Sequence, residues 1–325
     1  MQEISGKELF KKALGDGIKK GWSGFLWVMK ILVPISFLTL ILDYSGIIER
    51  LDFLLAPVMG ILSLPSVAAL PLVIGFLSGI YGAVAAMLVL PMGPEEMMLV
   101  AIFLLISHNL IQEGAVQKMA GVSSIKSTLF RLSTSAITVF ICALFLKPQG
   151  HHMASVAIEQ AIRGPFAPVL TEWALTTGAL AIRIFFIIMA VLTTLELMKA
   201  FQVIPYILKP LTPLMRLMGL ENKLGVLWLT AALFGLAYGS AVIVEETKAN
   251  NFTEAELSRL HLSIGINHAM IEDPALFLPL FLSVGASSLF MGFWLWVPRF
   301  IAAIVAVQLL NVWQRAHPVS AKVLP

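Results

Sequence analysis

Long apolar runs recur along this chain and set the first limit on its fold. They cover residues 25–42, 97–111 with an extension to 117, 132–146, 184–198 and 287–310. An α-helix of about 20 apolar residues spans the hydrocarbon core of a bilayer. The sequence is 58% hydrophobic and 13% charged, whereas a soluble domain is roughly half apolar and a quarter charged. The sequence therefore predicts an all-α polytopic membrane protein whose first partner is the lipid bilayer.

The N-terminal segment and the cysteine content narrow the class further. Residues 1–23 are Lys-rich and carry no apolar core with a small-residue cleavage site, so no cleavable signal peptide is expected. This segment is predicted to form either a basic amphipathic helix on the membrane surface or a solvated tail. The single cysteine, Cys142, excludes a disulfide framework, a cysteine-based zinc site and a paired-thiol redox motif.

A polar stretch inside one apolar run is repeated inside another. Residues 107–114 read Ser-His-Asn-Leu-Ile-Gln-Glu-Gly, and residues 267–274 read Asn-His-Ala-Met-Ile-Glu-Asp-Pro. Ionisable residues are costly inside a bilayer, and they mark ion pathways, proton relays or ligand sites. Gly114 and Pro274 end the two copies. A helix breaker at the same place in both predicts an interrupted helix, which frees backbone groups to bind a ligand.

Other features repeat in the same order, which indicates an internal duplication. Pro57 parallels Pro213, and the Gly-rich segment 79–83 parallels 235–241. Each repeat is predicted to contain three transmembrane helices and a re-entrant helical hairpin, because many Pro and Gly residues interrupt the segment 66–92. The predicted units are a basic amphipathic segment 1–23, a first repeat 24–146, a linker with a surface helix 147–177, a second repeat 178–313 and a cytoplasmic tail 314–325.

Charge placement predicts that the second repeat is inverted relative to the first. With a cytoplasmic N-terminus, inversion puts most of the 22 basic residues inside, including a loop that holds Lys118, Lys126 and Arg131. The exceptions are Arg50, Lys147, Arg163, Arg183 and Arg299. This bias follows the positive-inside rule. We therefore expect a protein of the bacterial inner (cytoplasmic) membrane with both termini in the cytoplasm. Inverted repeats that meet at the midplane are a transporter architecture.

The repeated polar stretches supply the candidate binding residues. For a substrate or ion these are His108, Asn109, Gln112, Glu113, Asn267, His268, Glu272 and Asp273. Imidazole and carboxylate groups suit protons or a divalent metal such as Fe, Mn or Zn. The candidate metal ligands are His108, Glu113, His268, Glu272 and Asp273. The amides suit a polar organic solute instead. In a purely structural alternative, all these groups only hydrogen-bond the two repeats together.

Two Gly-rich segments are predicted to form hairpin tips beside the polar helices. The candidate tip residues are Ser78, Gly79, Tyr81 and Gly82 in the first repeat and Gly235, Tyr238, Gly239 and Ser240 in the second. Glycine allows close approach and unusual dihedral angles, so backbone amides and hydroxyl groups can face a cavity. Close packing of helices through small residues explains the same glycines without a ligand.

The motifs of enzymes and nucleotide-driven pumps are absent from the sequence. Ser78 and His108 suggest an intramembrane serine protease, but the serine spacing does not fit a Gly-x-Ser-x-Gly elbow. Neither a His-Glu-x-x-His motif nor a P-loop occurs. No stripe of basic and aromatic residues is present, so nucleic acid is not expected as a partner. The pairs Glu95-Glu96 and Glu245-Glu246 flank the hairpins and are predicted to be solvated segment ends, with a role in ion entry as the alternative.

Four segments together resemble the nucleoside-recognition, or Gate, domain family, which includes spore maturation A/B-like membrane proteins. They are Tyr44-Ser45-Gly46-Ile47-Ile48, Leu55-Ala56-Pro57-Val58-Met59-Gly60, Gly75 to Ala83, and the polar helix that ends Gln112-Glu113-Gly114. The resemblance implies a module that forms a membrane gate. Similar modules occur in the ferrous-iron transporter B family, and the layout is similar to that of concentrative nucleoside transporters.

The sequence departs from both transporter groups. It has no G domain, and Cys142 is followed by Ala143 rather than by the proline of an iron-binding Cys-Pro motif. The Gln/Thr-Glu hairpin motif of nucleoside transporters is also absent. These departures prevent either substrate from being carried over.

The residues and the resemblance together predict a secondary transporter rather than an enzyme. Its solute is expected to be small and polar or cationic, with a divalent metal favoured and with Na⁺ or H⁺ as further cargo or coupling ions. One alternative is an ion-coupled nucleoside transporter. Another is a non-transporting assembly or signalling protein of the spore-maturation type. A homo-oligomer is left open.

Overall fold

A computed structural model describes residues 6–45, 55–119, 122–148, 165–203, 206, 210, 212–220, 224–225, 227–229, 231–232 and 252–316. All the regular elements in these ranges are helices, which agrees with the predicted all-α class. They are α1 (Gly6–Tyr44), η1 (Ser66–Ala68), α3 (Ala69–Ser78), α4 (Ile80–Met87), α5 (Pro94–Ser107), α6 (Leu110–Met119), α7 (Ser124–Leu146), α9 (Phe166–Ala200), α11 (Thr212–Leu217), α13 (Glu254–Asn267), α14 (Glu272–Ser283), α15 (Ser288–Trp294) and α16 (Val297–Ala316).

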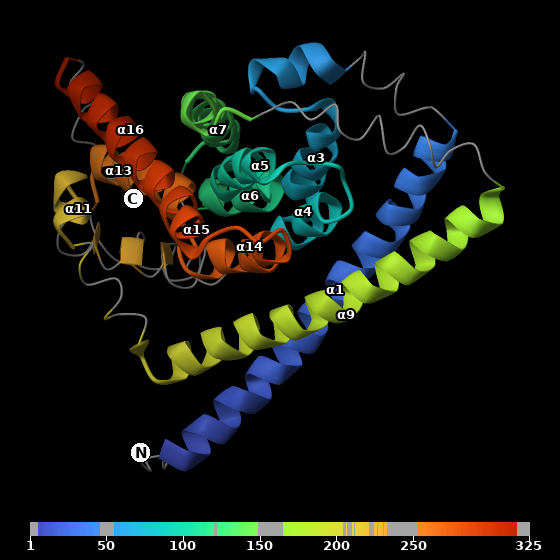
Figure 1. The fold of residues 1–325 in the computed structure, drawn as a ribbon. Helices are drawn as coiled ribbons and strands as arrows, with labels where there is room; N and C mark the ends of the chain where they lie inside the picture. The colour runs from blue at the N-terminus through green and yellow to red at the C-terminus, as the bar shows by residue number, and fades with distance from the viewer. Residues whose placement is uncertain are drawn as a thin grey trace.

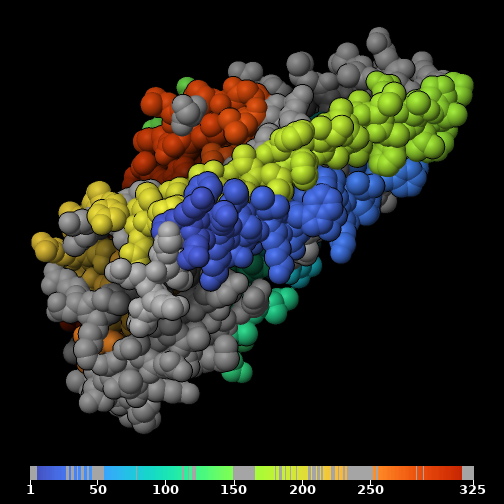
Figure 2. Space-filling model, turned by 90° about the horizontal axis from the view of Figure 1, so that it is seen from below, coloured from blue at the N-terminus to red at the C-terminus, as the bar shows by residue number. Residues whose placement is uncertain are grey.

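The two longest helices, α1 and α9, lie side by side and antiparallel beneath a bundle of shorter helices (Figure 1). Small residues let them approach closely, since a Cβ built on Gly17 would lie 2.7 Å from Thr193 Cα. Aromatic rings extend the contact, with Phe25 and Phe185 at a centroid distance of 5.2 Å. Seen from below, α1 and α9 run side by side across the face of the molecule (Figure 2).

Both long helices run through boundaries that the sequence predicted. Helix α1 continues from the Lys-rich segment into the apolar run without a break at residues 23–24. Its one proline, Pro34, lies further along the helix, and only there is an amide missing from the helical hydrogen bonding. Helix α9 begins at Phe166, inside the predicted linker 147–177. Residues 149–164 of the predicted linker with its surface helix lie outside the described residues.

Helix α5 forms the centre of the bundle, between α3, α7 and α13 (Figure 1). Every residue from Glu96 to Ser107 is buried. A helix that is apolar on all sides is stable only when other elements surround it. The carboxylate of Glu96 accepts a hydrogen bond from the Gly93 amide at 2.8 Å, so this residue caps α5 from the interior and is not the solvated end that was predicted. Glu245 and Glu246 lie outside the described residues.

Helices α3 and α4 form a hairpin that turns at Gly79. This residue has φ 85° and ψ −174°, a conformation that is essentially restricted to glycine. The reversal brings the two helices so close that a Cβ on Gly75 would lie 3.3 Å from Ala83 Cβ. A Cβ on Gly79 would also lie 2.8 Å from Asn109 Oδ1, at the start of α6. The predicted tip residue therefore forms the turn and contacts the polar helix.

Replacing Gly79 with alanine should destabilise the protein by about 1–3 kcal/mol, because alanine is strained at this φ and would displace Asn109. Gly178→Ala is the matched control. Gly178 lies within α9 with no other atom within 4 Å of its Cβ position, so alanine should stabilise the protein by about 1 kcal/mol or less. Thermal unfolding of the purified protein in detergent measures both effects. An unchanged midpoint for Gly79→Ala would contradict the assignment of Gly79 as the turn.

Two described helical stretches are long and apolar enough to cross a membrane, Ser124–Leu146 and Leu289–Ala316. A bent pair, Leu55–Ile61 and Ser66–Leu77, meets the same criterion with a bend of 84° and makes a third if it counts as one span. Large apolar side chains point outward from α7 and α16, as lipid-facing surfaces require. They include Ile137, Leu144, Phe145, Ile301 and Leu309.

The predicted span at 97–117 is not one continuous helix. It is divided into α5 and α6, with His108 and Asn109 between them. The same division separates α13 from α14 at His268. The protein is an integral membrane protein, and its central polar residues lie where these two helices are interrupted.

Candidate functional site

The two interruptions have the same backbone geometry. His108 and His268 are the C-caps of α5 and α13, with φ −85°, ψ 169° and φ −75°, ψ 163°. The residue after each histidine has a positive φ, 47° at Asn109 and 43° at Ala269. The two histidines are 160 residues apart. The duplicated sequence therefore builds a duplicated break.

The breaks lie before the residues that were predicted to cause them. Gly114 is inside α6, where a Cβ would lie 2.6 Å from Ser124 Oγ, so it serves close packing of α6 against α7. Pro274 is in the first turn of α14, where a proline is tolerated because its missing amide has no intrahelical partner. The prediction of interrupted helices is correct, but its stated cause is wrong.

Backbone hydrogen bonds hold each break against the segment before it in the chain. The Asn109 amide donates to Gly75 O at 3.0 Å, within the first hairpin. In the second half, the amides of Ala269 and Met270 donate to the carbonyl oxygens of Ala231 and Ala232 at 3.1 and 2.8 Å. The interruption therefore costs little free energy, because the amides released from the helix donate to other carbonyl oxygens in the protein interior.

Each histidine is oriented by the helix that it ends. His108 Nδ1 lies 2.8 Å from Leu104 O, and His268 Nδ1 lies 3.1 Å from Ile264 O. A carbonyl oxygen only accepts, so Nδ1 carries the proton in both rings. In the neutral ring Nε2 is then an acceptor with a free lone pair. This is the arrangement by which proteins orient histidines that bind metals.

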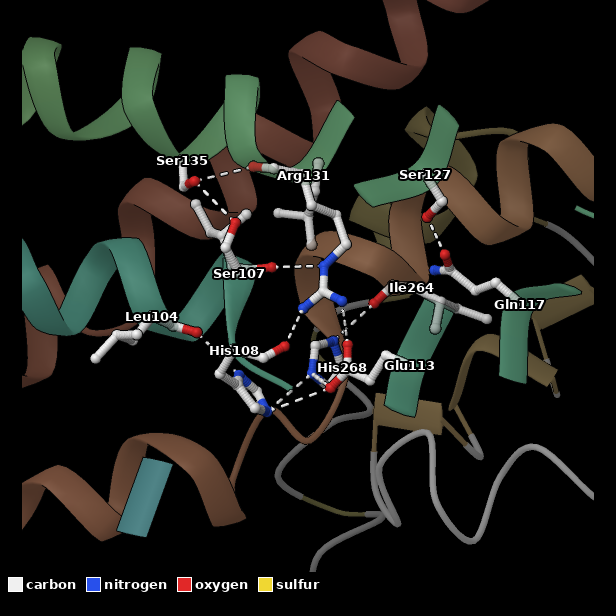
Figure 3. A network of polar contacts seen from close by, with 12 residues as sticks. Leu104, Ser107, His108, Glu113, Gln117, Ser127, Arg131, Ser135, Ile264 and His268 are labelled. Atoms are coloured by element: carbon white, nitrogen blue, oxygen red, sulfur yellow. Dashed lines mark hydrogen bonds and ion pairs between the residues drawn. The ribbon is translucent and has the colours of Figure 1, made fainter. Parts of the chain in front are cut away.

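The two Nε2 atoms face each other and the carboxylate of Glu113 (Figure 3). They are 3.4 Å apart. Glu113 Oε1 lies 3.3 Å from His108 Nε2 and 2.9 Å from His268 Nε2. Asp273 Oδ2 lies 3.5 and 3.8 Å from the same two atoms. We refer to these four buried residues as the histidine–carboxylate cluster.

The cluster brings four possible acceptor atoms together, namely the two Nε2 atoms, Glu113 Oε1 and Asp273 Oδ2. Two imidazole lone pairs and two carboxylate oxygens repel one another at these distances unless a positive charge lies among them. A proton shared by the histidines or a metal ion supplies that charge. One ligand atom each from His108, His268 and Asp273 lies within 4.8 Å of the others, which suits a single ion.

Two buried arginines support the cluster, one from each half of the molecule. Arg131 on α7 donates from Nε to Ile106 O at 2.8 Å and from Nη2 to His108 O at 3.0 Å. Its Nη1 also pairs with Glu113 Oε2. Arg299 on α16 donates from Nη2 to Ile266 O and His268 O at 3.0 and 2.9 Å. The guanidinium groups therefore bind the exposed carbonyl ends of α5 and α13.

The sequence interpretation missed both arginines as site residues. Arg131 was assigned to a cytoplasmic loop and Arg299 to the opposite surface, yet their exposed fractions are 1% and 2%. A signal was present, since each arginine lies in the apolar segment that follows a polar stretch. Counting Arg131 as a positive-inside charge and Arg299 as an exception to that rule concealed it.

The part of the chain that supplies half of the cluster is similar to a known protein family. The Gate family, described as "Nucleoside recognition", matches residues 25–163. This part of the chain is therefore similar to the Gate family. The matched residues include His108, Glu113 and Arg131, whereas His268, Asp273 and Arg299 come from the chain beyond the match.

The chain as a whole is similar to a membrane protein of Bacillus subtilis (strain 168). That relative, "Uncharacterized membrane protein YvoD", is 23% identical over 276 residues, which cover 84% of this chain and 87% of the relative. The similarity therefore extends well past the Gate domain into the second half. No solved structure matches the chain significantly.

The other predicted ligands are distributed around the cluster. Glu272, proposed as a metal ligand, instead pairs with Lys199 on α9 at 3.1 Å, with a side chain that is 36% exposed. It begins α14, and its neighbour Asp273 takes the inward position. Asn267 is buried, and neither atom of its amide has a partner among the described residues. In the first half of the chain, Asn109 contacts Gly79. The side chain of Gln112 is outside the described part of the structure.

The hairpin residues are only partly placed. Gly82 is buried in α4, and Tyr81, on the same helix, is half-buried beside Gly24 of α1. The side chain of Ser78 is outside the description. The second predicted tip, Gly235, Tyr238, Gly239 and Ser240, lies outside the described residues altogether.

Proposed function

We propose that this protein is a secondary membrane transporter that moves a divalent metal ion through the histidine–carboxylate cluster. The observation that carries the proposal is the convergence of two oriented Nε2 acceptors and two carboxylates, all buried within the helix bundle. Polar residues buried in this way are expensive in a membrane protein and need a positive charge as their partner.

The electrostatic balance of the site favours an added cation. The cluster holds two carboxyl groups and two imidazole rings, and the guanidinium groups of Arg131 and Arg299 lie at the helix ends beside it. The C-termini of α5 and α13 both end at the cluster, and each contributes a partial charge of about −0.5. These partial charges favour a cation, although the arginines reduce the field at the terminal carbonyls.

We further infer that the two halves are inverted repeats, each with a re-entrant hairpin. The equivalent breaks at His108 and His268 meet end to end, which supports this arrangement. Interrupted helices that meet at the repeat interface form the binding sites of many secondary transporters. The positive-inside distribution of the loop charges supports the same topology.

Other observations favour two alternative functions. The unpartnered amide of Asn267 suits a polar organic solute, and the description of the Gate family favours a nucleoside. The direct contact between His108 and His268 also suits an assembly protein whose halves are joined by these groups. A transport assay separates the three functions.

The assay measures uptake of Zn²⁺, Mn²⁺ and Fe²⁺ into liposomes that contain the purified protein, with labelled nucleosides tested under Na⁺ or H⁺ gradients. We expect saturable metal uptake that Asp273→Asn abolishes. Glu272→Gln is the matched control, because this neighbouring acid pairs with Lys199 rather than with the cluster. Saturable nucleoside uptake without metal uptake would favour the second function, and no uptake of either would favour the assembly role.

A further inference from the structure

A row of buried polar groups leads away from the histidine–carboxylate cluster on one side. It runs from Glu113 of the cluster to Gln117, one turn later on α6, and to His261, two turns before His268 on α13. Gly265 lies between His261 and His268 on the same helix. We call Gln117 and His261, together with the space at Gly265, the polar row.

Gln117 is the inner member of this row. Its side chain is buried, and Oε1 accepts a hydrogen bond from Ser127 Oγ on α7 (Figure 3). Its Nε2 has no partner among the described residues. A Cβ built on Gly265 would lie 3.4 Å from this nitrogen and 3.6 Å from Arg131 Cδ. The missing side chain of Gly265 therefore leaves a space about as wide as a methyl group where Gln117 and Arg131 face α13.

His261 is the outer member. It precedes Gly265 by one helical turn, so both lie on the same face of α13. The residue is buried, yet neither ring nitrogen has a partner within the described part of the chain. Leaving a buried polar group unpaired is energetically costly. Unpaired buried groups in a polar space of sufficient size are usually satisfied by water.

The equivalent positions on the other side of the cluster are apolar. At the separation of 160 residues that relates the histidines, His261 corresponds to Ala101, Gly265 to Leu105 and Gln117 to Phe277. All three side chains are fully buried in the apolar core. The two halves thus share the cluster but differ in the groups that lead to it.

We propose that water fills the space along the polar row and connects the cluster with the side of the membrane at which α13 begins. The row is then the access route for a hydrated cation, while Ala101, Leu105 and Phe277 close the opposite route in this conformation. This inference rests on the proposed function for the identity of the cation. The one-sided hydration itself does not depend on it.

Cysteine labelling tests the access route. Single cysteines are introduced in a Cys142→Ala background at His261 and, as a second reporter, at Gln117. The matched controls are Ala101→Cys and Leu105→Cys. A membrane-impermeant, positively charged methanethiosulfonate reagent is added to protein in liposomes from one side or from both. We expect the reporters to be modified from one side only and the controls to remain unmodified.

The outcomes separate the two proposals. If the cysteines at His261 and Gln117 react no faster than the controls, the access route is overturned, whether or not zinc stabilises the wild-type protein. If they react but zinc neither binds nor is transported, the access route is supported and the proposed transport of a metal ion is contradicted.

In addition, His261→Leu should slow zinc uptake at least about tenfold with an unchanged zinc-induced thermal shift. Unchanged zinc uptake would show that His261 has only a structural role in the protein core.

Discussion

Replacing either His108 or His268 with alanine should abolish metal-dependent thermal stabilisation and metal uptake. Each substitution removes one of two Nε2 atoms that face each other at 3.4 Å, so the remaining groups no longer surround an ion. Loss of a group that merely orients a ligand weakens metal binding roughly 10–100-fold, so loss of a ligand should exceed about 100-fold. Calorimetric titration and unfolding in the presence of Zn²⁺ measure the effect.

Ser135→Ala provides a nearby control for the histidine variants. Ser135 is buried and hydrogen-bonds Ser107 at 2.8 Å, but it does not reach the histidine–carboxylate cluster. Its replacement should lower the unfolding temperature slightly and leave metal affinity unchanged. If both histidine variants retained the full metal response, the cluster would not be the binding site.

Arg131→Met should produce the largest loss of stability of any single substitution at the site. Methionine leaves the buried carboxylate of Glu113 without its cationic partner and removes the donors to Ile106 O and His108 O. Breaking a buried ion pair by removing one partner costs about 3–5 kcal/mol. We expect a marked fall in the thermal unfolding midpoint, with part of it restored in the double variant Arg131→Met/Glu113→Gln.

The two arginines should differ in this test. Arg299 binds two backbone carbonyls, but no carboxylate lies within ion-pair distance of it among the described residues. Arg299→Met should therefore be less destabilising than Arg131→Met. Arg315→Met, at the exposed end of α16, should change stability by no more than about 0.5 kcal/mol. Equal losses for Arg131 and Arg315 would contradict the buried ion pair.

Several residues of the site could be predicted from the sequence, because ionisable residues inside an apolar run can be recognised from the local sequence alone. Two copies of a His-containing polar stretch inside apolar runs identified His108, Glu113, His268 and Asp273 as candidates. The Gly-rich segment before the first copy identified Gly79, which does form a turn and contacts Asn109. These predictions needed only the cost of polar groups in a membrane and the conformational freedom of glycine.

The position of the helix breaks could not be read in the same way. Gly114 and Pro274 are the local helix breakers, yet the chain departs from helical geometry at His108 and His268. The amides after each break are satisfied by carbonyl oxygens of segments that are distant in sequence, such as Gly75 O. A histidine can end a helix in the interior only when such partners are supplied by the fold.

The sequence by itself determined that this is an all-α membrane protein with a duplicated set of ionisable residues in its apolar interior. Only the tertiary structure decided which of those residues meet. In the folded protein Asp273 lies in the cluster and Glu272 pairs with Lys199, although the two acids are adjacent in the sequence. It also brought Arg131 and Arg299 to the helix ends. Hydropathy depends on composition along the chain, whereas a binding site depends on distances between side chains from different helices.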